Sequence, residues 1–379
     1  MKRKLIFLML SSTLLAACGK TAAPDTQEGT GEEATEQTTE KGGAVVPDNA
    51  LGTSFYRPAL LDGAYQPSKS RGITLRMNSS VNLKSFETGL MRLSQAYYPT
   101  KDYLFQEGQM VPSDTIQSWI GRESEENPQG LNPADNGKKE PDERNPIYLQ
   151  TILEQDYYKQ TENGPKLAGI SMGLGMNLVD YYRKEQFGWE FETNLTREQL
   201  LKEGQKMADQ MIKQMRELDG VGELPIMVAI FEQAPRDNLA GGVYISRGIS
   251  QKGAGSVGEW TAVNERKEVF PLTGSDTNEG NSFKNFKSEV ESFFPNLSGV
   301  TGVAHYFDDQ LADLNVDIVT QFYGAGEMIA FTQYVTEAAG KFLPPNIRTS
   351  ITIESLDGVE AILMRNTGET EFEAHVFTD

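Results

Sequence analysis

Cysteine and histidine are almost absent from this sequence of 379 residues. It contains a single cysteine, Cys18, and two histidines, His305 and His375. One cysteine cannot form an intramolecular disulfide framework, and the histidines lack the close spacing that zinc sites use. We therefore expect neither a metal nor a cofactor, and no cysteine nucleophile in the folded part.

Positive charge is also scarce. The chain has 35 Lys and Arg against 54 Asp and Glu, which gives a formal net charge of −19 at pH 7. Such a surface repels phosphate backbones, so we expect no nucleic acid partner. The same excess of acid argues against a basic patch that lies on anionic lipid. Apolar residues still make up 38% of the chain, enough for the cores of two ordinary domains.

Long apolar runs are missing as well, except for a short one that begins at Leu5. It is too short to span the roughly 30 Å of a bilayer core. Lys2, Arg3 and Lys4 precede it, and Leu15-Ala16-Ala17-Cys18 ends it. A basic start, a short apolar run and small residues before a cleavage site are typical of a secretory signal peptide.

The cysteine directly after the two small residues makes this site a lipobox. We predict that prolipoprotein diacylglyceryl transferase modifies Cys18 and that signal peptidase II cleaves between Ala17 and Cys18. Residues 1–17 would be removed, and the diacylglycerol on Cys18 would hold the chain at the extracytoplasmic face of the cell membrane. The alternative is a plain signal peptide that a cysteine follows by chance.

Residues 18–50 follow as a predicted disordered tether. This stretch is rich in Thr, Glu, Gly and Ala and has almost no large apolar side chain, so burial cannot offset the entropy cost of folding. A flexible chain of this length spans roughly 30 Å by coil statistics. The tether would let the folded part stand off from the membrane.

The folded part shows alternating strand and helix patterns. Phe86, Leu90, Leu93 and Tyr97 form one helical stripe, and Thr196 with Gln199 forms a capping box before the clearest helix. We expect further helices from Ser113 to Ile120, through Phe283 to Phe294 and over 327–342. The predicted strands are 71–77, 103–105, 167–177, 224–231, 243–249, 259–263, 300–307, 314–322, 348–355 and 361–364, and 121–144 is predicted to be a mobile polar loop.

These elements divide into two halves, 51–236 and 237–379. In each half an aromatic helical stripe ends at a proline, and a strand with a polar end follows. Each half reads β-α-β-β-α-β, so we predict an α+β fold of two tandem ferredoxin-like repeats. Two unrelated α+β lobes are the alternative. The aligned polar ends predict two similar clefts, whose candidate residues are Phe105, Gln106 and Gln109 in the first half and Phe307 and Gln310 in the second.

Three short motifs carry possible chemistry. Gly169-Ile170-Ser171-Met172-Gly173 matches the G-x-S-x-G nucleophile elbow, with His305 and His375 as the available bases. We favour a small-residue strand there, because no capped helix follows. Residues 253–258 match G-x-G-x-x-G, but the strand-like 259–263 follows instead of a helix, which indicates a loop.

The third motif is the acidic cluster Asp308, Asp309, Asp313 and Asp317. Its oxygen atoms could hold Ca²⁺ weakly, but the EF-hand spacing is absent, so we favour a solvated acidic face. Trp119, Trp189 and Trp260 could line a peptide or glycan groove, although aromatic residues are first of all core residues.

Several segments together resemble the CamS family of sex pheromone lipoproteins. They are the lipobox leader, F-E-T-G-L-M-R-L at 86–93, Y-L-F-Q-E-G-Q at 103–109, L-E-Q-D-Y at 153–157, F-T-Q-Y-V-T at 331–336 and K-F-L-P-P at 341–345. The resemblance covers nearly all of the folded part, from about residue 56 to the C-terminus. It implies a Gram-positive, membrane-anchored lipoprotein built of two repeats.

The resemblance also implies a second product. In this family the apolar end of the cleaved leader is secreted as a hepta- or octapeptide, which a receptor recognises and which induces conjugative plasmid transfer. Here that peptide would be Ser11-Ser12-Thr13-Leu14-Leu15-Ala16-Ala17, with or without Leu10. Its three polar residues depart from the apolar peptide of the family. The alternative is a leader that is merely degraded.

For the mature part we expect a non-catalytic binding or interaction module. Two alternatives stay open on the sequence: a cell-surface serine hydrolase that uses Ser171, and a solute-binding lipoprotein of a transporter, which would need two lobes that close on one ligand.

Overall fold

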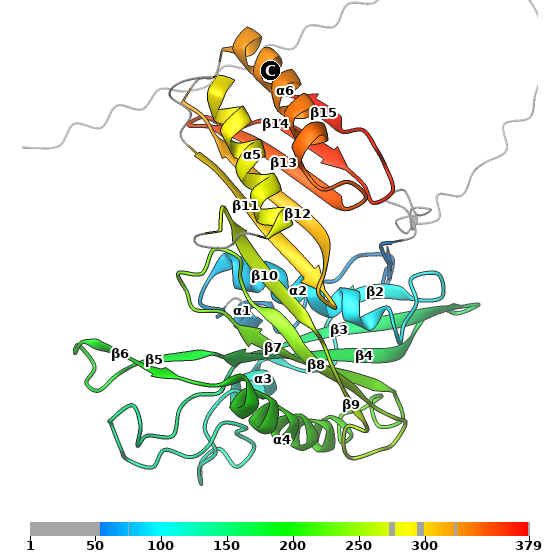
Figure 1. Cartoon of the computed structure of the whole chain (residues 1–379). Helices are drawn as coiled ribbons and strands as arrows, with labels where there is room; N and C mark the ends of the chain where they lie inside the picture. Colours follow the sequence, from blue (N-terminus) through cyan, green and yellow to red (C-terminus); the bar gives the residue numbers. More distant parts are fainter. Residues whose placement is uncertain (1–53, 75, 273–276, 294–298, 322–323, 378–379) are drawn as a thin grey trace, which may run out of the picture. The chain divides into compact units, whose positions relative to one another are not determined.

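The computed structural model describes residues 54–74, 76–272, 277–293, 299–321 and 324–377 (Figure 1). These residues all belong to one compact unit of the chain. The predicted leader, Cys18 and the predicted tether lie outside the described residues. The described residues form a mixed α+β fold of six helices and three sheets.

The described part of the chain contains the following helices and strands. The helices are α1 (Arg71–Thr74), α2 (Ser80–Ser94), α3 (Ser113–Trp119), α4 (Arg197–Met215), α5 (Asn278–Phe293) and α6 (Ala325–Phe342). The strands are β1 (Arg57–Pro58), β2 (Leu104–Glu107), β3 (Leu149–Thr161), β4 (Gly164–Asn177), β5 (Val179–Arg183), β6 (Glu190–Asn194), β7 (Ile226–Gln233), β8 (Val243–Ser250), β9 (Trp260–Ala262), β10 (Glu265–Phe270), β11 (Gly299–Phe307), β12 (Gln310–Val319), β13 (Arg348–Ser355), β14 (Gly358–Arg365) and β15 (Glu373–Val376).

The larger sheet has the strand order β1-β2-β3-β4-β7-β8-β9 and is covered on both faces. Helices α3 and α4 pack on one face, and α2 packs on the other (Figure 1). Its central strand β7 is therefore buried at every position. In β4, a Cβ on Gly173 would lie 2.8 Å from the ring of Phe86, so only glycine lets α2 approach this closely.

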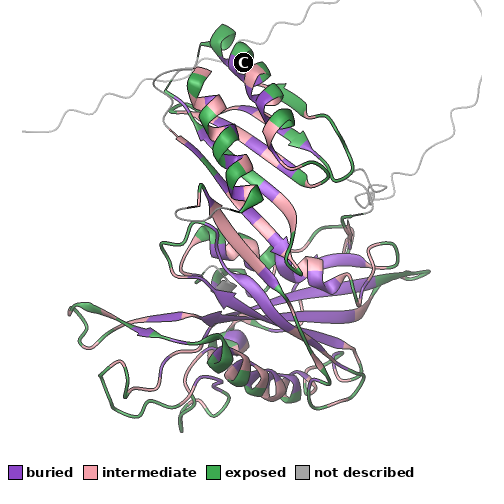
Figure 2. Ribbon diagram, in the orientation of Figure 1, coloured by how far each residue is buried: buried purple, intermediate pink, exposed green. Residues whose placement is uncertain are grey.

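The second sheet has the order β10-β11-β12-β13-β14-β15, and α5 and α6 pack on it. Strand β12 alternates: Leu314, Val316 and Ile318 are buried, while Asn315 and Asp317 are exposed. This period of two is typical of a sheet with one covered and one open face. Figure 2 shows the outer surfaces of α5 and α6 largely exposed.

The two large sheets share one pairing pattern, but it is not the ferredoxin-like one. From β2 to β9 and again from β10 to β15, only the middle pair, β4–β7 or β12–β13, is parallel. In a split βαβ unit, the two strands joined by a helix are parallel and another strand lies between them. Here β10 and β11 flank α5 and pair directly and antiparallel. The tandem ferredoxin-like prediction is therefore not confirmed.

The change from one sheet to the other also differs from the expected boundary. The predicted second half begins at residue 237, but strands β8 and β9, which follow this residue, belong to the first sheet. The change lies between Ala262 and Glu265. A hairpin of β7 and β8 completes the first sheet before the chain leaves it.

Most of the predicted helices and strands are confirmed, and the capping box at Thr196 and Gln199 is present as predicted. The strand predicted at 71–77 is wrong, because 71–74 form the short helix α1. The alternation at 71–77 that predicted a strand rests on few apolar residues. Within α1, Ile73 is the apolar residue that is buried. The predicted loop at 121–144 has no helix or strand, but buried Asn132 fastens it by donating to the carbonyl oxygens of Ile120 and Leu149 at 2.8 Å each.

Arg216 at the end of α4 joins three segments through its guanidinium group. Nη1 donates to the carbonyl oxygen of Leu224 at 2.6 Å, Nη2 to that of Gln251 at 2.9 Å and Nε to that of Ala254 at 2.9 Å. Only a planar group with several fixed donors can reach carbonyl groups on both connecting loops at once.

We expect Arg216→Lys to lower the free energy of unfolding by about 2 kcal/mol, because a single ammonium leaves several carbonyl groups without their donors. Urea unfolding monitored by circular dichroism measures this change. The control is Lys213→Gln at an exposed position of the same helix, which should change stability by less than about 0.5 kcal/mol. Equal stability of the Lys variant and the parent chain would contradict the role of Arg216.

Candidate functional site

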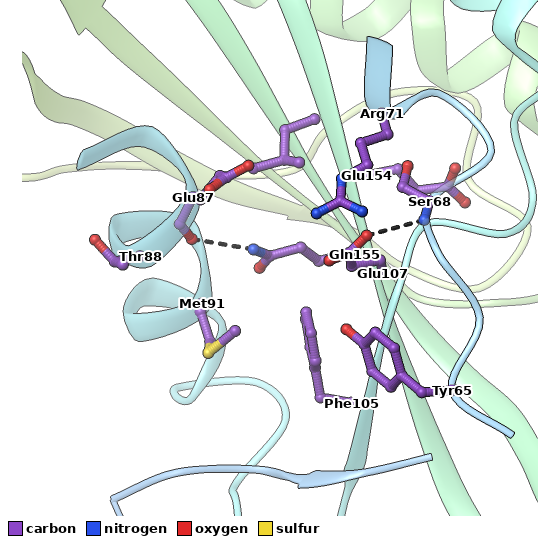
Figure 3. A pocket seen from close by; sticks show the side chains of 11 residues that line it. Tyr65, Ser68, Arg71, Glu87, Thr88, Met91, Phe105, Glu107, Glu154 and Gln155 are labelled. Atoms are coloured by element: carbon purple, nitrogen blue, oxygen red, sulfur yellow. Dashed lines mark hydrogen bonds between the residues drawn. The ribbon is translucent and has the colours of Figure 1, made fainter. Parts of the chain in front are cut away.

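A pocket of about 340 Å³ lies where α2 passes over the β2–β3 edge of the larger sheet. The segment that leads into α1 closes its remaining side. Every lining residue lies between Tyr65 and Gln155. Figure 3 shows the side chains of Phe105, Tyr65 and Met91 bordering one side of the pocket and the guanidinium group of Arg71 reaching toward it.

One part of the lining is apolar. Phe105 of β2 and Leu153 of β3 are buried on the sheet face that α2 covers, and Met91 of α2 is half-buried opposite them. Tyr65 is 45% exposed, so this aromatic wall is open to solvent on one side. Small-molecule sites combine such an apolar wall with a few polar groups.

The polar part of the lining carries more negative than positive charge. Three acidic residues, Glu87, Glu107 and the buried Glu154, line the pocket together with one cation, Arg71. Burial raises the pKa of Glu87 and the nearby charge of Glu107 raises it further, while Arg71 opposes the shift. Because the carboxylates repel each other, a cationic group of a ligand would be stabilised between them.

Hydrogen bonds hold the polar groups in position. The backbone N–H of Ser68 donates to Oε2 of Glu107 at 2.9 Å, and Nε2 of Gln155 donates to the carbonyl oxygen of Glu87 at 3.0 Å (Figure 3). The first bond fastens the 65–71 segment to β2, and the second fastens α2 to β3. The walls of the pocket are thus tied to the sheet.

Strand β3 carries a buried pair of acids, Glu154, which lines the pocket, and Asp156. Glu154 accepts from the backbone N–H groups of Met110 at 2.8 Å and Val111 at 3.0 Å. Asp156 accepts from the N–H of Gln109 at 2.8 Å through Oδ2, while its buried Oδ1 has no partner. The pair therefore holds the loop after β2 by its backbone.

The surroundings of this pair favour its protonated form. Burial raises the pKa of Asp156 well above its usual range, and the neighbouring charge of Glu154 adds to the shift. Burial likewise raises the pKa of Glu154, against the donors from Val111 and Met110. The pair therefore keeps a proton at pH values where an exposed aspartic acid has lost it.

Of the three residues predicted for the first cleft, only Phe105 is among the lining residues of the pocket. Phe105 lines the pocket, but the next residue, Gln106, points to the other face of the strand, where it exchanges hydrogen bonds with the backbone of Gln66. Gln109 lies outside the lining, and its side chain donates to the carbonyl oxygens of Glu107 and Pro67. Successive residues of a strand face opposite ways, so Phe105 and Gln106 could not share one cleft, and Gln109 lies beyond the end of β2.

Phe307 and Gln310 do not form the matching cleft. They pair with each other across the β11–β12 turn, and Gln310 is exposed. The guanidinium carbon of Arg92 lies 4.0 Å from the ring centre of Phe307. The prediction aligned the strand that contains Phe105 with the strand that contains Phe307. In the two sheets, however, the position of β2 in the strand order corresponds to that of β10 and not to that of β11.

Ser171 is not a nucleophile elbow. It lies in the middle of the continuous strand β4, is fully buried, and its Oγ accepts from Ser94 at 2.8 Å. His305 instead contacts Glu265 at 2.5 Å and Asp313 at 3.3 Å. The alternative of a serine hydrolase that uses Ser171 is therefore wrong.

The other motifs are structural. Residues 253–258 form the loop between β8 and β9, as expected. Asp308 and Asp309 form the β11–β12 turn with positive φ angles of 48° and 61°, and Asp313 is engaged by His305. In the part of the chain that the structure describes, no group of three or more His, Cys, Asp or Glu side chains is arranged to hold a metal ion.

The pocket contains residues that sequence patterns did not identify, notably Tyr65, Arg71, Glu87 and Gln155. The apolar stripe of α2 identified the buried side of the helix, whereas Glu87 lies on the flank of the helix.

The lining residues come from one sheet and the segments packed on it. This arrangement argues against the solute-binding alternative, which needs two lobes around one ligand. Among the described helices, none is long and apolar enough to cross a membrane.

Comparisons with known proteins agree with one another. The model of the family described as CamS sex pheromone cAM373 precursor matches residues 65–371. A crystal structure of a sex pheromone precursor from Lactobacillus salivarius subsp. salivarius is 43% identical, with a TM-score of 0.83 over 88% of this chain and 98% of that one. The C-terminal domain of the sex pheromone staph-cAM373 precursor from Staphylococcus aureus is 30% identical, with a TM-score of 0.68 over 80% of this chain and 100% of that one. No curated protein matches the chain.

The acid pair predicts a pH dependence of stability. Because the pKa of Asp156 is raised in the folded state, its contribution is complete below about pH 4, the range of an unfolded aspartic acid, and is lost as the pH rises through the folded pKa. Asp156→Asn keeps a neutral group there. We expect its free energy of unfolding to fall less than that of the parent chain between pH 5 and pH 9.

Urea unfolding across this pH range measures the difference. The control is Asp102→Asn at an exposed position, which should leave the pH dependence unchanged. Parallel curves for the Asp156 variant and the parent chain would show that the pair does not hold a proton.

Proposed function

Because the chain belongs to the CamS sex pheromone cAM373 precursor family, we propose that it is a lipoprotein with two products. The first is a peptide from its leader, and the second is the mature chain, anchored through diacylglycerol on Cys18 at the extracytoplasmic face of the cell membrane. The basic start, the short apolar run and the lipobox at 15–18 support this proposal. Signal peptidase II and prolipoprotein diacylglyceryl transferase are the implied processing partners.

The proposed pheromone is Ser11–Ala17, or Leu10–Ala17 if one more residue is kept. After secretion it would bind a receptor on responsive cells and induce conjugative plasmid transfer. The names of the two similar structures, both sex pheromone precursors, support this assignment. A leader that is only degraded is the alternative.

For the mature chain we propose a non-catalytic binding module whose site is the pocket between α2 and the β2–β3 edge. The observation that carries this proposal is the combination of an apolar wall at Phe105 with two carboxylates, Glu87 and Glu107, that one arginine faces. The matching ligand has an apolar body and a cationic group. Aromatic side chains favour such cations as well.

Peptide release can be measured in culture supernatants by mass spectrometry. We expect a peptide that ends at Ala17 and begins at Ser11 or Leu10, because cleavage before Cys18 creates its C-terminus. The peptide should be lost from a strain with Cys18→Ala, in which the lipobox is broken.

A synthetic Ser11–Ala17 peptide added to the same medium sets the detection limit. If no such peptide is found above that limit, the leader is only a sorting signal. A peptide that persists in the Cys18→Ala strain would contradict release through the lipobox.

Ligand chemistry can be tested by thermal unfolding of the mature chain with three matched probes. We expect 2-phenylethylamine to raise Tm in a concentration-dependent way, with less effect from 2-phenylethanol and least from phenylacetate, since a ligand stabilises the state that binds it. Phe105→Ala should abolish the shift, and Glu87→Gln should reduce it.

The matched control is Glu162→Gln in the exposed β3–β4 turn, which should leave the shift unchanged. Stronger stabilisation by phenylacetate than by the amine would contradict a cation-binding pocket. An amine effect that survives Phe105→Ala would place the binding elsewhere.

A further inference from the structure

The hairpin of β5 and β6 carries two large aromatic side chains at its tip. Phe187 is 91% exposed and Trp189 is 88% exposed. The two strands pair only with each other and extend as an arm beyond the larger sheet, with an exposed end (Figures 1 and 2). Two exposed aromatic residues on one projecting turn indicate a surface that contacts something else.

Two polar backbone groups at this tip are already paired. The N–H of Gly188 donates to the carbonyl oxygen of Glu185 at 3.0 Å, and Nη1 of Arg183 donates to the carbonyl oxygen of Gly188 at 2.9 Å. An apolar surrounding would therefore leave neither of these groups without a partner, which is a requirement for insertion into lipid.

The charges near the tip balance, because residues 183–190 carry two basic side chains, Arg183 and Lys184, and two acidic ones, Glu185 and Glu190. Nζ of Lys184 lies 2.7 Å from the carboxylate of Glu140, and Arg236 pairs with Glu190. Lys184 also lies 4.3 Å from the ring centre of Phe191. The tip therefore presents apolar rings without a net charge that would attract anionic groups.

The size of the tip favours a bilayer over a protein. A Phe and a Trp together offer roughly 400 Å², which is about half of the roughly 800 Å² that each partner buries in a standard protein interface. Tryptophan is enriched at the headgroup level of membranes, where its ring is buried and its N–H stays hydrated. Two rings on a narrow hairpin can enter that layer while the strands remain outside.

We propose that Phe187 and Trp189 insert into the interfacial layer of a lipid bilayer. In the cell this contact rests on the proposed function, because the lipid on Cys18 would bring the chain to the membrane. The hairpin then provides a second attachment point, which limits the freedom that a long tether would otherwise allow. A lipid anchor raises the effective concentration of the hairpin at the bilayer, so that a weak second contact can form.

The test uses the chain from residue 18 onward with Cys18→Ser, which lacks the leader and the lipid but keeps every described residue. We expect it to sediment with phosphatidylcholine vesicles, and brominated acyl chains should quench its tryptophan fluorescence. The double variant Phe187→Ser and Trp189→Ser should bind at least tenfold more weakly, with an unchanged Tm because both side chains are exposed. Replacing part of the lipid by phosphatidylglycerol should weaken binding at low salt, since the chain carries a net charge of −19 over its full length.

Leu356→Ser is the matched control, because Leu356 is 87% exposed on the β13–β14 turn and is not part of the hairpin. It should bind vesicles like the parent chain. The proposal is overturned if the parent chain does not bind phosphatidylcholine vesicles, or if the double variant binds as well as the parent. The tested protein has neither the leader nor the lipid. The vesicle result is therefore independent of whether the pheromone and the lipid anchor are confirmed.

Discussion

The carboxylate of Glu265 joins the two large sheets of this protein. It is 5% exposed at the start of β10, where Oε2 lies 3.0 Å from Nη2 of Arg92 and Oε1 lies 2.5 Å from Nε2 of His305. Burial alone would raise the pKa of Glu265, but His305 and Arg92 outweigh it and keep the pKa below its usual range. A buried charge is tolerated only when partners compensate it, so α2 of one sheet and β11 of the other must stay together around this group.

Helix α2 connects that junction to the candidate site. Arg92 near its end contacts Glu265 and Phe307, while Glu87 and Met91 of the same helix line the pocket. The opposite side of the helix is buried against the larger sheet through Phe86 and its neighbours. The position of the pocket wall therefore depends on the same packing that holds the two sheets together, although the pocket itself is lined from the first sheet only.

Local patterns predicted the local structure of this chain well, and pairing between distant segments much less well. The capping box at Thr196 and the apolar stripe of α2 are encoded within a few residues, so both were correct. Strand β10 reads E-R-K-E-V-F and was missed, because its charges are compensated by His305 and other distant residues. Strand alternation could have separated Phe105 from Gln106, but only the structure shows which face α2 covers and that Arg71 reaches the pocket.

In the proposed function, a leader that would act after cleavage is separate from a folded part that would act at the membrane. Plasmid transfer frequency in mixed cultures tests this separation most directly, with cells that produce residues 1–50 alone, the full chain, or the full chain behind the leader of an unrelated lipoprotein. The account predicts equal induction by residues 1–50 and the full chain, and none with the exchanged leader. Induction that follows the folded part, whichever leader precedes it, would contradict the account.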